Sequence, residues 1–455
     1  MSQVAVAASS TAALAAWEST FNQLADCLLD QLGGNEHLSI ELAGEQSHFM
    51  RLNAGKVRQS GLVTDASINI RLIANQRTAY AGFPFTGDLA VDRVVALSQL
   101  QHLRQDLPQL PEDPYIVLPE NFGSSREAYA GQLLTPDQVP AALLPAVQGI
   151  DFTGIYASGP LVRANRNSAG QQHWFATEAF VLDYSLIAPS EKAVKATLAG
   201  QQWDQTGYEA QIQQSMTQLQ VLDRPVQVID PGQYRTYFAP AATAELIGML
   251  SWGGVSEASM QQGGSALTKL REGESLSPHL TLKENFKLGL VPRFNSLGEV
   301  APAEVPLLVD GQLVNTLVNA RTAKEYQVKS NGASAYEGMR SPEVLPGTLK
   351  TEDILNQLGT GLYLSNLHYL NWSDRSGGRI TGMTRYACFW VEQGEIIAPI
   401  KDLRFDDSLY EFLGAKLENL TDTQEFIPCV DTYGARSLGG SLMPGLLVNN
   451  FTFTL

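Results

Sequence analysis

The 455-residue sequence is poor in cysteine and histidine, and it lacks the motifs that bring such residues together. Its three cysteines, Cys27, Cys388 and Cys429, lie far apart, and no C-x-x-C pair occurs. Neither a disulfide framework nor a zinc ribbon is therefore indicated, and a reducing compartment fits the chain. No two of the six histidines lie three to five residues apart, which excludes a pair of histidine ligands on one helix but leaves open a site assembled from distant histidines.

The sequence also lacks dense runs of Lys and Arg, and its formal net charge is −16. Such a chain repels phosphate backbones, so we expect no nucleic-acid binding. No stretch approaches the ~18 apolar residues of a membrane span. The first basic residue is Arg51, which is too late for the n-region of a signal peptide. We therefore expect a cytoplasmic protein without a membrane anchor.

Common catalytic signatures are missing as well, since the sequence has no G-x-S-x-G, P-loop or H-E-x-x-H motif. Cys429 precedes a glycine-containing loop, but no histidine lies near it in sequence to activate the thiol. We expect burial of Cys429, with catalysis by this thiol as the alternative, and we expect Cys388 in the core. Among the histidines, His368 has aromatic neighbours and is the one expected to be buried.

Ordinary globular composition, with 44% hydrophobic residues, predicts two or three domains. Residues 17–31 have an amphipathic helical pattern. Alternating stretches between residues 38 and 83 predict antiparallel strands with a turn at Asn75-Gln76. Asp88 is placed to cap a second helix, and four prolines between residues 105 and 120 predict a linker or an extended crossing segment.

Further along, residues 167–170 give a turn signal between two strands. Ser190 is placed to cap a helix over residues 191–200, and residues 208–222 show another helical face. In the last half short alternating runs dominate, with hairpin signals at Asp310-Gly311 and Gln393-Gly394 and a strand pattern at the C-terminus.

These patterns predict an α+β fold in three regions. They are an N-terminal α/β unit (1–110), a middle α/β region (111–225) and a large β-rich C-terminal domain (226–455). Within the last region, residues 239–265 look like a short helix running into a polar loop with glycines, a place where hydrolases often present metal ligands. This stretch contains no His and no Cys.

The segment 361–414 resembles the signature of the TldD/PmbA family. It contains G-R-I-T-G-M-T-R at 378–385 and A-P-I-K-D-L-R-F at 398–405. Residues 68–98 are similar to the N-terminal block of that family, and the order of blocks agrees from about residue 38 to 455. The resemblance implies an N-terminal α/β region and a β-rich C-terminal domain, as the patterns do.

The resemblance also implies a function. One branch of the family, TldD, is a zinc peptidase whose helix carries H-E-x-x-x-H, with a cysteine near the C-terminus. The other branch, PmbA or TldE, lacks these ligands and pairs with the first to trim or degrade peptides, including leader peptides. Here the matching helix reads E-L-I-G-M-L, and Tyr433 stands in the turn that holds the family cysteine.

We therefore expect a degenerate counterpart of the metal site near Glu245, Leu246, Met249, Leu250 and Tyr433. No catalytic, cofactor-binding or metal residue is assigned, and no cofactor is expected. The chain is interpreted as a PmbA/TldE-like subunit that pairs with a TldD-type zinc peptidase subunit, or with itself, and helps to enclose an unfolded or leader peptide. The alternatives are a non-catalytic homodimeric binding or assembly protein, and a free-standing peptidase with a different nucleophile.

Overall fold

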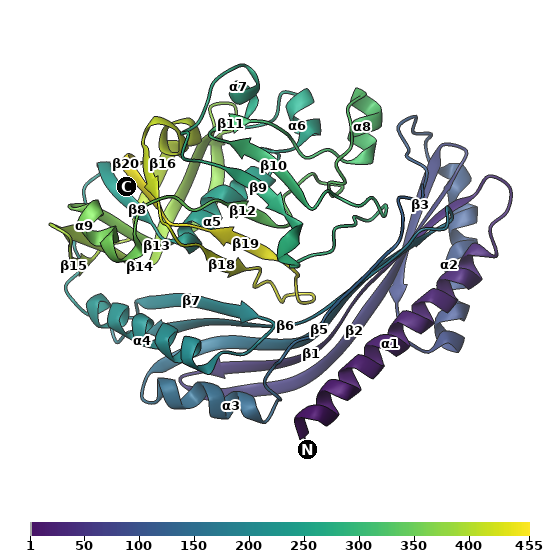
Figure 1. Cartoon of the computed structure of the whole chain (residues 1–455), viewed down its shortest axis with the longest axis horizontal. Coiled ribbons are helices and arrows are strands. Elements are labelled where there is room, and N and C mark those ends of the chain that lie inside the picture. Colours follow the sequence, from purple (N-terminus) through teal and green to yellow (C-terminus); the bar gives the residue numbers. More distant parts are fainter. Residues whose placement is uncertain (1) are drawn as a thin grey trace.

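The structure, a computed structural model, describes residues 2–455, with side chains described from residue 14 onward. A long curved sheet carries helices on its outer face, and a β-rich C-terminal part packs against its inner face (Figure 1). This arrangement confirms the predicted α+β class, with an N-terminal α/β region followed by a β-rich C-terminal region.

The N-terminal elements are α1 (Ser2–Leu29), β1 (His37–Asn53), β2 (Lys56–Ala74), β3 (Arg77–Pro84), α2 (Leu89–Asp106), η1 (Leu107–Gln109), β4 (Ser125–Tyr129), α3 (Gln138–Leu143), η2 (Leu144–Val147), β5 (Asp151–Asn167), β6 (Gln172–Ile187), β7 (Ala193–Gly200) and α4 (Gln205–Leu222). The strands form a first sheet in the order β3-β2-β1-β5-β6-β4, with β7 paired to β6. All of these pairs are antiparallel except β4 with β6. Both N-terminal regions, 1–110 and 111–225, thus supply strands to one sheet.

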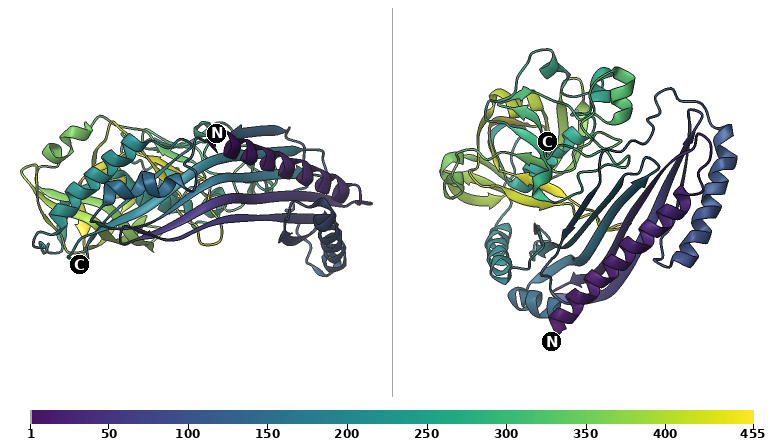
Figure 2. Two further views of the ribbon diagram at one scale, coloured as in Figure 1. Left: turned by 90° about the horizontal axis from the view of Figure 1, so that it is seen from below. Right: turned by 45° about the vertical axis from the view of Figure 1, so that its right-hand side comes forward.

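Side chains alternate between the two faces of the first sheet. Leu38, Ile40 and Leu42 of β1 are at most 1% exposed and belong to the cluster that packs under α1 and α2. Figure 2 shows these helices along the outer face, away from the C-terminal part. The alternate positions, such as Glu41 and its register partner Asn69, lie on the inner face. The inner face is therefore polar.

Several local predictions for this part are confirmed. Asn75 and Gln76 have φ of 50° and 56° and form the turn between β2 and β3. Asp88 caps α2, because its carboxylate accepts a hydrogen bond from the backbone N–H of Ala90 at 2.9 Å. The turn at residues 167–170 joins β5 and β6 as expected.

The helix predicted over residues 191–200 is wrong. Ala193–Gly200 is the strand β7, which pairs with β6 along its whole length. Ser190 lies in the preceding turn and caps no helix. The second half of β6 offers its backbone groups to this stretch, and Val194 becomes 2% exposed there, so tertiary pairing outweighs the local capping signal.

The C-terminal elements are β8 (Gly232–Phe238), α5 (Pro240–Gly248), η3 (Met249–Ser251), α6 (Glu257–Gln261), α7 (Thr268–Arg271), β9 (Leu282–Asn285), η4 (Phe286–Leu288), β10 (Glu304–Val309), β11 (Gln312–Leu313), α8 (Ala320–Tyr326), β12 (Pro342–Val344), η5 (Thr351–Asp353), α9 (Ile354–Leu358), β13 (Gly361–Asp374), β14 (Arg379–Glu392), β15 (Glu395–Pro399), β16 (Arg404–Ser408), η6 (Glu411–Ala415), β17 (Leu417–Leu420), β18 (Glu425–Pro428), β19 (Gly440–Met443) and β20 (Leu446–Phe453).

These strands form two sheets with α5 between them. One sheet has the order β11-β10-β9-β12-β19-β18. The other has the order β13-β8-β20-β16-β14-β15, and β13 also pairs with β14, so five strands close into a ring. Helix α5 contacts β13 of the ring and β19 of the neighbouring sheet. The hairpins at Asp310-Gly311 and Gln393-Gly394 and the C-terminal strand are confirmed.

Across residues 2–455, none of the helices combines the length and the apolar character that crossing a membrane would require.

Candidate functional site

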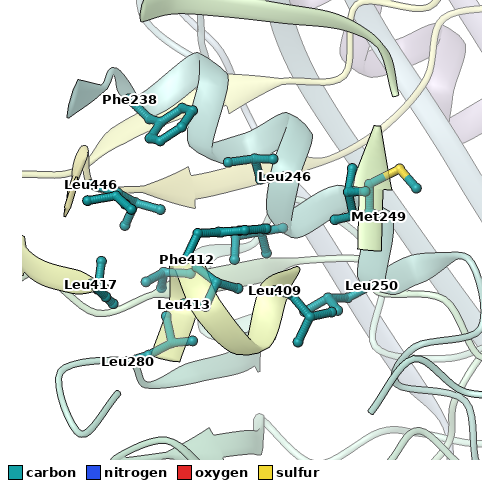
Figure 3. Packing of buried hydrophobic residues seen from close by; sticks show 14 of the residues in the cluster. Phe238, Leu246, Met249, Leu250, Leu280, Leu409, Phe412, Leu413, Leu417 and Leu446 are labelled. Atoms are coloured by element: carbon teal, nitrogen blue, oxygen red, sulfur yellow. The ribbon is translucent and has the colours of Figure 1, made fainter. Parts of the chain in front are cut away.

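Helix α5 is the segment in which the family resemblance would place metal ligands. Pro240 opens the helix at its first position, where the missing N–H is not needed. Leu246, Met249 and Leu250 are 1%, 3% and 1% exposed and belong to the largest apolar cluster among the described side chains. Figure 3 shows them among Phe238, Phe412 and several leucines. These three residues thus contribute packing at the positions assigned to the degenerate site.

Glu245 is the one carboxylate within the E-L-I-G-M-L segment, and its side chain is not part of this apolar cluster. Glu245 is exposed to solvent, and the neighbouring protein raises the pKa of its carboxyl by partial desolvation, an effect that Lys195 of β7 partly offsets. Because Lys195 belongs to the first sheet, Glu245 lies on the side of α5 toward that sheet.

The donor set at α5 does not fit a zinc ion. Zinc sites use about three or four N, S or carboxylate ligands, and Glu245 supplies one. Tyr433 is fully exposed in the loop between β18 and β19. Among the described residues, no group of three or more His, Cys, Asp or Glu side chains is placed to hold a metal ion.

A polar groove separates the inner face of the first sheet from the C-terminal part. It comprises two cavities of about 760 and 710 Å³. The two cavities share lining residues from both parts, including Glu41 and Asn69 of the sheet and Asn295 and Ser296 of the opposite wall. We call this continuous space the inner groove. Its volume is that of a site for a small molecule or a peptide segment.

The sheet wall of the inner groove carries charged groups. Glu41, Asn69 and Asn165 are register partners across β1, β2 and β5 and form one polar row. Burial raises the pKa of Glu41 to about 7, although Arg71 opposes the shift. Burial lowers the pKa of Arg71 and of Arg163, which flank this row.

The opposite wall is fixed by Arg340. Its guanidinium donates hydrogen bonds to the backbone carbonyls of Pro292, Phe294 and Gly332 at 3.1–3.2 Å. Asn165 of the sheet donates to the carbonyl of Ser296 at 3.0 Å and so ties the two walls together. These bonds fix the position of the opposite wall relative to the sheet at this point.

Two further contacts join the C-terminal part to the N-terminal part. Arg436, 4% exposed, reaches from the loop between β18 and β19 into the first sheet and donates to the carbonyls of Gly159 and Ala179 at 3.1 and 2.8 Å. In the cavity of about 710 Å³, Arg321 of α8 forms an ion pair with Asp113. The segment 105–120, predicted as a crossing segment, thus lies against the C-terminal part.

Expectations for cysteine and histidine are met in part. Cys388 is 2% exposed, as predicted. The predicted burial of Cys429 is wrong, because it lies exposed in the loop after β18, where it lines the groove. The expectation that His368 is the buried histidine is also wrong: it is partly exposed where β13 runs beyond the core, whereas His48 and His173 are 6% and 3% exposed.

Sequence reasoning assigned no groove residue. The alternation of β1 and β2 indicated an outer apolar face, and it could also have indicated Glu41, Asn69 and Arg71 as one inner polar face. What covers that face depends on residues more than a hundred positions away.

Comparisons with known proteins agree with this architecture. Residues 231–455 match the model of the PmbA/TldA metallopeptidase C-terminal domain. A comparison with curated proteins gives no match. Among solved structures, TldE from Thermococcus kodakarensis is similar with a TM-score of 0.75 and 16% identity, covering 97% of this chain and 100% of that chain.

Two other structures are similar, and both are described as candidate modulators of DNA gyrase. The one from Thermotoga maritima has a TM-score of 0.74 and 16% identity, covering 96% of this chain and 100% of that chain. The one from Bacteroides thetaiotaomicron has a TM-score of 0.74 and 13% identity, covering 96% and 98%. At these identities the likeness shows a shared fold.

The fold and the matched domain define a protein of the metallopeptidase type, built from a curved sheet and a β-rich C-terminal domain around a groove. With its C-terminal half matched by the family model, the chain belongs to the TldD/PmbA family.

Proposed function

We propose that this chain is a PmbA/TldE-like subunit of a cytoplasmic TldD/TldE-type peptidase, which acts in proteolysis and peptide maturation. In this proposal the chain binds no zinc itself and pairs with a TldD-type subunit that carries the metal. The observation that carries the proposal is the packing of α5. Leu246, Met249 and Leu250 are buried in the apolar core, and their side chains offer no ligand atom to a zinc ion.

The inner groove supports a role in holding peptide. It is bounded by the polar face of a sheet on one side and by loops of the C-terminal domain on the other. Polar groups on both walls can hydrogen bond to the backbone of an extended chain. We further propose residues 226–455 as the unit that carries the family fold, with residues 1–110 and 111–225 as two N-terminal units.

The experiment is reconstitution. The chain is co-expressed with a tagged TldD-type subunit, and the purified material is assayed for cleavage of an unfolded peptide. We expect co-purification and cleavage, no cleavage by this chain alone, and no cleavage when the histidine ligands of the partner are replaced by alanine. Cleavage that survives that replacement would place the active site in this chain and overturn the proposal.

Two alternative functions give other results in the same assay. A homodimeric binding or assembly protein would elute as a dimer by light scattering and would not retain the TldD-type subunit. A free-standing peptidase would cleave without any partner, and the exposure of Cys429 on the groove is the observation that favours it.

A further inference from the structure

One end of the inner groove contains buried polar atoms that have no hydrogen-bonding partner among the described residues. They are Oγ of Ser39, Nε of Arg71 and Oγ1 of Thr78. Ser39 is the register partner of Arg71, and Arg71 is the register partner of Tyr80, so these residues lie on one face of three adjacent strands. Thr78, two residues before Tyr80, shares that face.

This face looks into the groove. Arg71, Thr78 and Tyr80 line the cavity of about 710 Å³. Buried polar groups in folded proteins nearly always have a partner, and a group without one calls for a specific explanation. The Thr78 hydroxyl and the Arg71 guanidinium, both able to donate, line this cavity together, and Ser39 lies beside Arg71 on the neighbouring strand. Each of the three groups can therefore donate a hydrogen bond for which the described residues supply no acceptor.

The charges around Arg71 leave its guanidinium available. Asp113 is engaged in the ion pair with Arg321. Glu41 acts on Arg71 electrostatically, but the two side chains form no ion pair in the described part of the chain. The guanidinium carbon lies over the ring of Tyr80, 6.0 Å from its centroid, and the Arg71 side chain makes no hydrogen bond to the other described residues. The N–H groups of Arg71 are thus available to donate hydrogen bonds to an incoming ligand.

We propose that this end of the inner groove is a carboxylate-binding subsite, in which the Arg71 guanidinium takes both oxygens of a peptide carboxylate and the Thr78 hydroxyl donates to one of them. The subsite rests on the proposed function, since it assumes that the groove receives peptide. A planar guanidinium matches a carboxylate in fork-to-fork geometry. A phosphate dianion fits less well, because the carboxyl groups of Glu41 and Asp113 lie near the same cation.

The carboxylate can come from the C-terminus of a peptide or from an Asp or Glu side chain. The probes are therefore three fluorescent hexapeptides of one sequence: the free acid, the C-terminal amide, and the amide with one glutamate in place of glutamine. Binding to the full-length chain is measured by anisotropy. The expected result is at least tenfold tighter binding of one carboxylate-bearing peptide than of the neutral amide. Which of the two binds tighter identifies the source.

The variants are Arg71→Gln and, as a matched control on the same strand, Arg58→Gln, whose side chain is exposed outside the groove. The preference for carboxylate should fall to about twofold or less in the first variant and stay unchanged in the second. Arg71→Lys keeps the positive charge but loses the planar guanidinium that pairs with both carboxylate oxygens, so it should retain part of the preference for carboxylate. Partial retention in this variant would show that the loss in Arg71→Gln is not due to misfolding. Equal binding of all three peptides, no binding of any, or a preference that survives Arg71→Gln would each overturn the subsite.

The subsite and the proposed function fail separately. If the chain does not co-purify with a TldD-type subunit but still prefers carboxylate peptides through Arg71, the function is overturned and the subsite stands. If the pair forms and cleaves peptide but shows no carboxylate preference, the subsite is overturned and the function stands.

Discussion

The backbone N–H of Arg436 donates a hydrogen bond to Oε1 of Glu45 at 3.2 Å, across 391 positions of sequence. Glu45 lies on β1, 3% exposed, and its other carboxylate oxygen accepts from the hydroxyl of Ser47 at 2.5 Å. The guanidinium of Arg436 reaches the same strand through Ser47 at 3.2 Å. One loop of the C-terminal domain is therefore locked into the first sheet by a buried network of polar groups.

Replacing Arg436 with alanine should destabilise the chain. The change removes donors from two carbonyls and from Ser47, and it leaves Glu45 as a buried carboxylate with less compensation. We expect a loss of about 3 kcal/mol in the free energy of unfolding, measured by chemical denaturation. Arg51→Ala, on an exposed position of β1, is the control and should change stability by about 0.5 kcal/mol or less. Equal stability of the two variants would mean that the loop is not anchored in this way.

The carboxyl of Glu41 should make stability depend on pH. Its pKa is raised from 4.5 to about 7 by burial, so the folded chain keeps a proton that the unfolded chain releases. The folded state binds more protons between these two values, and stability therefore falls as the pH rises from about 4.5 to about 7. Below about pH 4.5 the Glu41 carboxyl is protonated in both states, so it does not change stability with pH. Above about pH 7 it is ionised in both states, and the full loss of stability has been reached.

Glu41→Gln removes the ionisable carboxyl and should abolish this fall of stability with pH. Relative to wild type, the variant should gain about 1–2 kcal/mol between pH 5 and pH 8, less than for a fully enclosed group because the groove is open to water. Denaturation curves at both pH values measure the difference. Asp65→Asn, exposed on β2, is the control and should show no such gain. A gain of the same size in both variants would contradict the assignment to Glu41.

The fold was largely predictable because its signals are local. The alternation of β1 and β2, the cap at Asp88 and the hairpins at Asn75-Gln76 and Gln393-Gly394 depend on neighbouring residues alone. The strand β7 was not predicted because it forms by pairing with the second half of β6. The sequence of residues 191–200 alone does not indicate that pairing.

The candidate site was less predictable. The apolar spacing of α5 predicted that the helix packs in the core. Only the resemblance to a family indicated that Leu246 and Met249 stand near positions where other members carry zinc ligands. The groove follows from the contact between two parts of the chain, and a strand such as β1 does not encode what will face it. The exposure of Cys429 has the same origin, since the loop that carries it is held by Arg436 instead of by an apolar core.

Purified protein should contain far less than one equivalent of zinc. The reason is the donor set at α5, in which Leu246 and Met249 are buried apolar groups and Tyr433 is exposed. Elemental analysis of protein purified without chelator gives the stoichiometry, and the melting temperature should not change on addition of a chelator, because no metal contributes to folding. A TldD-type subunit treated in parallel is the positive control. About one zinc per chain, or a melting temperature lowered by chelator, would contradict the prediction.

The packing role of α5 predicts a contrast between adjacent residues. Leu246→Ala leaves a cavity in the main core and should lower the free energy of unfolding by about 3 kcal/mol. Glu245→Ala, one position earlier with its side chain outside the cluster, should change it by about 0.5 kcal/mol or less. Chemical denaturation of both variants tests the contrast. A Leu246→Ala variant as stable as wild type would mean that α5 does not depend on its apolar face.

Cys429→Ser should leave both the fold and the peptidase activity of the reconstituted pair nearly unchanged. The thiol is exposed on the groove, but a nucleophilic cysteine needs a base to form its thiolate, and no imidazole hydrogen bonds to this thiol within the described residues. Melting temperature and the cleavage rate of the pair are measured side by side, with Cys27→Ser as the control for loss of a thiol elsewhere. A rate lowered about a hundredfold or more at unchanged melting temperature would instead make Cys429 a catalytic residue, because a loss of that size removes stabilisation of the transition state itself.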